Sequence, residues 1–196
     1  MSAASQGASY LLEVEPLDLG EDVRAVGLDL TETDENREPV RGPDSAAIWS
    51  RVLAAIAATE PWALDFFSHL DRIRDYCARH QIGFREANQH SLVIPAPTPV
   101  AVEALLDRFQ GETFGARAGP LVASADVALE GELARRGVDA YHKAFPRYFF
   151  CAVCNFEDGS VVVLSEKLWA SEIIRRVRPA VANVPGIDLD VRLPSD

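Results

Sequence analysis

The chain has 196 residues, of which 48% are hydrophobic and 25% are charged, and its formal net charge is −11. This composition is typical of a globular protein, and a chain of this length buries enough surface to fold without a disulfide or a metal. The excess of acidic groups argues against nonspecific binding to a phosphate backbone or to anionic lipid. No apolar run approaches the roughly 18 residues that a membrane span needs, so we expect no membrane association.

Cysteine usage and the N-terminal residues bear on location. Residues 1–9 carry no positive charge and no apolar run, unlike a secretory signal. Only three cysteines are present, and an odd number spread thinly suits a reducing compartment. We therefore expect a cytoplasmic protein.

The negative charge is concentrated in the first quarter of the chain. Residues 1–44 hold 11 acidic against three basic residues, whereas residues 45–145 and 146–196 have net charges of −2 and −1. Within this first quarter, apolar alternation predicts strands over 11–17 and 24–31. The polar residues 32–44, rich in turn formers, predict an exposed loop.

The middle of the chain reads mainly as helices. Helical spacing of apolar residues predicts a helix that is capped by Asp44 or Ser45 and a second one that starts at Pro61 and stops at Gly83. Two short strands, 84–87 and 92–95, follow around a turn at 88–90. A third helix begins after the capping Thr98 and ends at Gly111, a glycine-punctuated connector covers 111–119, and Ser124 caps a fourth helix that ends at Gly137.

The last quarter predicts a ββαβ unit. Two β-rich runs, 148–156 and 161–165, flank a Gly159 turn, and Ser165 caps a helix with Trp169 on its apolar face. Pro179 should kink or end this helix, and 187–193 alternates as a final strand.

Hairpins dominate this pattern, which favours an α+β fold with a mainly antiparallel sheet and about five helices. One compact domain over 1–196 is the preferred division. Two lobes, 1–110 and 124–196, are the alternative.

Two charged features could bind a partner or an anion. Arg175, Arg176 and Arg178 form the basic cluster of the last helix, and guanidinium groups grip phosphate or carboxylate well. The opposite charge lies in an acidic segment, 29–38, that contains Asp29, Glu32, Asp34 and Glu35. Opposite charge alone suggests that this segment docks on the arginines, in the same chain or in a second copy. A solvated helix face is the plainer interpretation of the arginines.

A zinc site is the alternative interpretation of the cysteines. Cys77 and His80 have the i, i+3 spacing that places two ligands on one helix face, and Cys151 and Cys154 form a C-x-x-C pair. However, the flanks of the pair read as the middle of a strand, where residues three apart point to opposite faces. Buried core cysteines are therefore the preferred interpretation, and we predict no cofactor.

No strong catalytic or phosphate-binding motif is present, which favours a non-enzymatic protein that acts by protein–protein contact through its acidic N-terminal segment. The alternative is a small-ligand-binding protein or an enzyme whose site is assembled from scattered residues, because such a site leaves no local motif.

Overall fold

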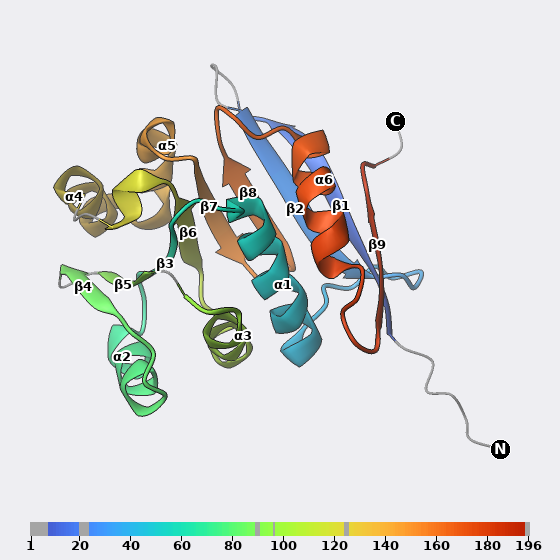
Figure 1. Ribbon diagram of the computed structural model, residues 1–196, viewed down its shortest axis with the longest axis horizontal. Coiled ribbons are helices and arrows are strands. Elements are labelled where there is room, and N and C mark those ends of the chain that lie inside the picture. Colours follow the sequence, from blue (N-terminus) through green and yellow to red (C-terminus); the bar gives the residue numbers. More distant parts are fainter. Residues whose placement is uncertain (1–7, 20–23, 89–90, 96, 124–125, 195–196) are drawn as a thin grey trace.

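One nine-stranded sheet organises the molecule, in the order β4-β5-β3-β6-β7-β8-β2-β1-β9 (Figure 1). This computed structural model describes residues 8–194 except 20–23, 89–90, 96 and 124–125. The strands are β1 (Ala8–Asp18), β2 (Arg24–Glu32), β3 (Trp62–Phe66), β4 (Arg85–Asn88), β5 (Ser91–Pro95), β6 (Phe114–Ala118), β7 (Phe150–Asn155), β8 (Ser160–Leu164) and β9 (Ile187–Arg192). All neighbours pair antiparallel except β1 and β9, which are parallel.

Six α-helices accompany the sheet in the described part of the chain. They are α1 (Gly42–Ala57), α2 (Leu70–Arg79), α3 (Pro99–Arg108), α4 (Val127–Arg136), α5 (Tyr141–Ala144) and α6 (Ala170–Val181), with short 3₁₀ turns η1 (Pro120–Ala123), η2 (Gly137–Ala140) and η3 (Phe145–Arg147). The expected α+β class and its C-terminal ββαβ unit, β7-β8-α6-β9, are confirmed. None of these helices is long and apolar enough to cross a membrane.

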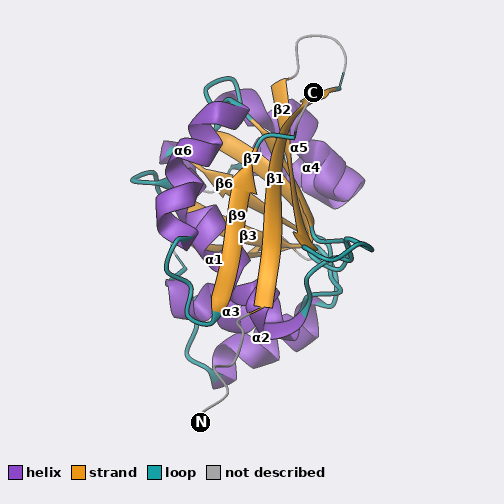
Figure 2. Cartoon of the chain, turned by 90° about the vertical axis from the view of Figure 1, so that its right-hand side faces the viewer, coloured by secondary structure: helices purple, strands orange, loops and turns teal. Residues whose placement is uncertain are grey.

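Side chains alternate between two differently covered faces of the sheet. On the first face, Leu12, Leu28, Val163 and Ala152 belong to a core of 40 buried hydrophobic residues that includes α1, α3 and α6. On the second face, a smaller core of 13 residues forms beneath α4, η2, α5 and η3. Figure 2 shows α1 and α6 on one side of the sheet and α4 and α5 on the other.

The predicted helix over 61–83 is wrong in its first half. Residues 62–66 form β3, whose Leu64 and Phe66 face the first core while Ala63 faces the second. A strand buried on both faces carries apolar residues at every register, so its spacing can be mistaken for that of a helix. Only α2, from Leu70 onward, follows the expectation.

The predicted connector over 111–119 is also wrong, because 114–118 forms β6 between β3 and β7. All five of its residues are buried. Its Gly115 leaves the space that the Tyr141 side chain occupies, and this partner is 26 residues away in the sequence, outside any local pattern.

Several helix ends follow the sequence and others differ. The Thr98 side chain accepts from the Ala101 N–H, as expected for a cap. α1 begins at Gly42, ahead of the expected cap, with Pro43 in its first turn. The cap of α4 is the Asp126 carboxylate, whereas the predicted cap Ser124 lies outside the described residues.

At the C-terminal end, the Ser165 hydroxyl accepts from the backbone of Lys167 and Leu168, ahead of α6. Trp169 is the N-cap residue of α6 and is 55% exposed, so it does not join the buried face as expected. The helix continues to Val181, two residues beyond Pro179.

The two stretches that the alternative division would separate share the sheet. Residues 1–110 contribute β1–β5 and residues 124–196 contribute β7–β9, and β2 pairs directly with β8. The number of independently folding units stays a prediction.

Candidate functional site

Three carboxylates gather on the second face, beyond the edge of the α4–α5 layer. Glu13 stands opposite Asp29 in the β1–β2 register, and Glu15 stands opposite Gly27. Because Gly27 has no side chain, the Glu15 and Leu17 stems lean to within 3.2–3.4 Å of where its Cβ would be. We call Glu13, Glu15 and Asp29 the acidic face.

The acidic face is electrostatically unfavourable as it stands. Partial burial, followed by repulsion from Glu15 and Glu13, raises the pKa of Asp29. Arg37 relieves part of this, since its guanidinium lies 3.1 Å from a Glu13 oxygen. Within the described residues, no ion pair reaches Glu15 or Asp29.

The predicted acidic segment is only partly in this face. Asp29 belongs to it, whereas Glu32 and Glu35 are exposed at the end of β2 and in the loop that follows. The Asp34 carboxylate accepts from the backbone N–H groups of Asn36 and Arg37 and shapes that loop. Glu13 and Glu15 were missed, although their alternation within the first predicted strand was a usable signal.

The arginines of α6 lie on the opposite side of the sheet from the acidic face. Arg175 and Arg176 both bind Glu172 of their own helix, and these hydrogen bonds lower the pKa of Glu172 to about 2. Arg176 also donates to the Ile56 carbonyl at 2.9 Å, which ties α6 to α1.

Arg178 donates to the Val191 carbonyl of the edge strand β9 at 2.5 Å. Each arginine thus has a partner in its own chain. The structure does not bring the arginines and the acidic segment together within one chain, and the version with a second copy stays a prediction.

The cysteines are separated by the sheet. Cys154 lies in the first core with Cys77, whereas Cys151 lies in the second core, so the C-x-x-C thiols diverge as the strand pattern predicts. Burial raises the pKa of all three thiols, that of Cys77 to about 11. His80 is exposed, and its ring centroid lies 4.2 Å from that of Tyr76, with the two rings tilted by 31°. Across the described ranges, no group of three or more His, Cys, Asp or Glu side chains could hold a metal.

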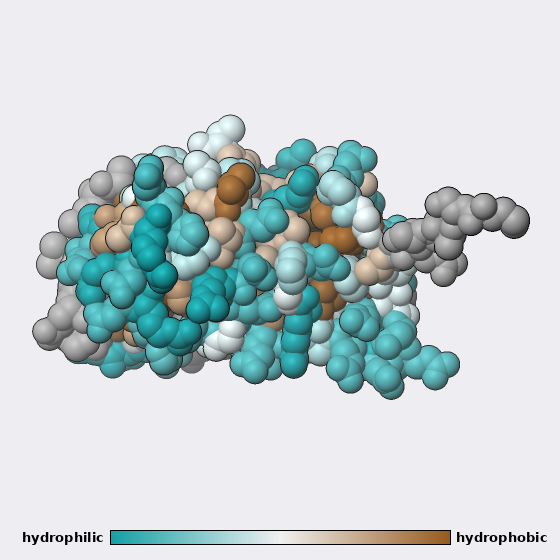
Figure 3. All heavy atoms as spheres, turned by 90° about the horizontal axis from the view of Figure 1, so that it is seen from below, coloured by the Kyte–Doolittle hydropathy of each residue, from teal (hydrophilic) through white to brown (hydrophobic). Residues whose placement is uncertain are grey.

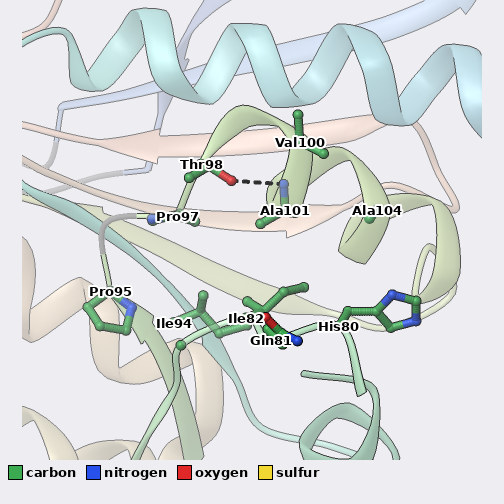
Figure 4. A pocket seen from close by; sticks show the side chains of 11 residues that line it. His80, Gln81, Ile82, Ile94, Pro95, Pro97, Thr98, Val100, Ala101 and Ala104 are labelled. Carbon is green, nitrogen blue, oxygen red and sulfur yellow. Dashed lines mark hydrogen bonds between the residues drawn. The ribbon is translucent and has the colours of Figure 1, made fainter. Parts of the chain in front are cut away.

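A hollow of about 320 Å³ lies between the end of α2 and the start of α3 (Figure 4). Its walls are mainly apolar, with Ile82 and Ile94 on one side and the α3 residues Val100 and Ala101 on the other. Val100 is 78% exposed. The titratable side chain in the lining is His80.

A charged network lies buried under the α4–α5 layer. Arg117 on β6 forms a two-point ion pair with Asp65 on β3, at 2.7 and 3.2 Å, and both side chains are at most 1% exposed. The Tyr141 hydroxyl donates to the same carboxylate at 2.5 Å. Burial opposes the charge of Arg117, but Asp65 outweighs this effect, so the pKa of Arg117 is raised.

The network continues to the surface through Tyr148. The Tyr148 hydroxyl accepts from Arg117 at 3.0 Å and donates to Asp126 at 2.8 Å. Asp126 also accepts from Arg147, whose side chain is 45% exposed. The deep members are sealed from solvent, so in this conformation the network holds structure and offers no reactive group to a substrate. No local pattern in the sequence indicates this network, because its members are far apart along the chain.

Comparison of the chain with protein-family models, with curated proteins and with solved structures finds no match.

Proposed function

We propose that this chain is a non-enzymatic cytoplasmic protein that binds a basic protein partner through its acidic face. One observation carries the proposal: Glu13, Glu15 and Asp29 share a sheet surface next to the helical layer, and within the described residues only Glu13 is paired with a cation. Three unpaired cysteines are compatible with a reducing compartment.

Burial of Asp29 and repulsion from Glu15 and Glu13 are only partly relieved within the chain. Holding like charges close together on a partly buried surface costs folding free energy, and a cation from a partner would offset that cost. The Arg37–Glu13 pair demonstrates that a guanidinium fits against this surface. By contrast, the face drawn in Figure 3 is mostly hydrophilic, with hydrophobic side chains in small separate areas, so it offers no extended apolar surface to a partner.

The test titrates a tri-arginine peptide, the probe, into the ¹⁵N-labelled full chain and follows binding by NMR. We expect the shifted backbone amides to cluster on β1 and β2. The triple variant Glu13→Gln, Glu15→Gln, Asp29→Asn should weaken binding at least tenfold.

The matched control removes the same charge from α2 and α3, with Asp75→Asn, Glu103→Gln and Asp107→Asn at exposed positions. This variant should bind the peptide nearly as well as the wild-type chain. An equal loss in both triple variants would mean that only net charge attracts the peptide, and it would overturn the proposal.

A second candidate function, binding of a small uncharged and mainly apolar molecule, is favoured by the hollow between α2 and α3. Its volume of about 320 Å³ reaches the lower end of ligand pockets. A thermal-shift screen of such compounds tests it, with Ala101→Leu as the variant that fills the hollow. Stabilisation that persists in Ala101→Leu would place the ligand elsewhere.

A further inference from the structure

The helical layer on the second face is an excursion between two neighbouring strands. β6 and β7 pair with each other, and the chain between them forms the whole layer. Where the chain returns, the Phe149 N–H donates to the Ala118 carbonyl at 2.7 Å. A Cβ at Gly119, where φ is +136°, would lie 3.0 Å from the Phe149 nitrogen. The two ends therefore touch, and the described residues between them contribute no strand to the sheet.

Several polar bonds join this layer to the sheet, beside its apolar contacts. Tyr141 binds Asp65, Tyr148 accepts from Arg117, and Glu130 on α4 binds Arg85 on β4 at 2.8 Å. Among the described residues, the apolar cluster there has 13 buried members, against 40 on the first face. Water can replace polar bonds but cannot replace apolar contacts, so this layer should separate from the sheet more readily than the first-face helices.

Asp126 joins the start of α4 to the rest of the network. Its carboxylate caps α4 through the Leu129 N–H at 3.1 Å and binds Tyr148 at 2.8 Å and Arg147 at 2.9 Å. Through Tyr148 it is linked to Arg117 on the sheet. Loss of Asp126 would remove the link from α4 through Tyr148 to Arg117, while the Glu130–Arg85 and Asp65–Arg117 pairs would remain.

We infer that the described residues 126–147 form a lid that opens as a unit while the sheet and the first-face helices stay folded, and that Asp126 is its latch. Opening uncovers the Asp65–Arg117 pair and Cys151. This inference is independent of the acidic face and of the proposed function.

The three cysteines report on the lid directly. Cys151 lies under it, whereas Cys154 and Cys77 lie in the first core. Under native conditions, iodoacetamide should label Cys151 faster than Cys154, as measured by peptide mass spectrometry. Asp126→Asn should raise the ratio of the Cys151 rate to the Cys154 rate about tenfold.

Tyr148→Phe is the milder variant, because it removes one hydroxyl and keeps the ring. It should raise the same ratio several-fold. If circular dichroism shows that Asp126→Asn is unfolded, Tyr148→Phe is the variant that tests the lid. Glu172→Gln, which breaks ion pairs of α6 on the first face, is the control and should leave the ratio unchanged. An unchanged ratio in a folded latch variant, or equal labelling of Cys151 and Cys154 in the wild-type chain, would overturn the inference.

Discussion

The Tyr141 hydroxyl oxygen lies 2.2 Å from the point where a Cβ on Gly115 would stand. The Tyr141 ring thus packs directly on the β6 backbone, and this close approach puts its hydroxyl on the Asp65 carboxylate. Glycine is required at position 115 for space and not for backbone conformation, because Gly115 does not have a positive φ.

We predict that Gly115→Ala destabilises the protein by about 1–3 kcal/mol, because the added methyl forces Tyr141 out of its place. Urea denaturation measures this loss. The control is Gly131→Ala in α4, where a Cβ meets nothing within 4 Å and alanine is the better helix former, so the chain should gain about 0.5–1 kcal/mol. If the two variants have the same stability, the packing of Tyr141 on Gly115 is contradicted.

Tyr141→Ala tests the same contact by removing the ring. We expect a loss of about 3–5 kcal/mol, as for other buried aromatic truncations. The cavity that remains adjoins the Asp65 carboxylate, so phenol should raise the melting temperature more than toluene does, because it can restore the lost hydrogen bond. Equal effects of phenol and toluene would show that the carboxylate does not face the cavity.

The buried ion pair should be strongly non-additive. Asp65→Leu and Arg117→Met each leave an unpaired buried charge, and we expect each to cost about 3–5 kcal/mol of unfolding free energy. The double variant should cost clearly less than the sum of the two, because it leaves neither charge. Additive losses in urea denaturation would mean that the pair contributes nothing as a pair.

Local pattern predicted the elements that carry a local signal, such as alternation, a β-rich run, a glycine turn or a capping side chain. β1 and β2 were predicted from apolar alternation and β7 and β8 from β-rich runs, and Gly159, with φ at +67°, forms the expected turn. Thr98 caps α3 by a bond within three residues. Each of these depends on neighbours that one stretch of sequence contains.

The errors fall where distant residues decide the conformation. β3 carries Asp65 and β6 carries Arg117, and each charge is tolerated in the middle of the sheet because of the other, 52 residues away. Gly115 is small because of Tyr141, and Asp126 caps α4 while it also binds Tyr148. The acidic face likewise forms by β1–β2 pairing. The alternation of its two glutamates is present in the sequence, but their proximity to Asp29 depends on the strand register.

Asp29→Asn should raise the stability of the chain and weaken its binding of the peptide. Because the pKa of Asp29 is raised in the folded chain, the native state holds its proton more tightly than the unfolded state does. The stability of the wild-type chain therefore falls as pH rises from below the ordinary carboxyl value of 3.8 through the higher folded value, and it stays lowered at neutral pH. Asparagine keeps the shape and removes the charge, so the variant should have a higher urea midpoint at pH 7 and no advantage below pH 3.8.

The same substitution should weaken binding of the tri-arginine peptide, because the carboxylate that costs stability is the one that attracts the cation. Asp188→Asn, an exposed change of equal charge on β9, is the control and should alter neither quantity by a comparable amount. If Asp29→Asn lowered the urea midpoint at pH 7, Asp29 would be stabilised within its own chain. The acidic face would then carry no unrelieved repulsion for a partner to offset.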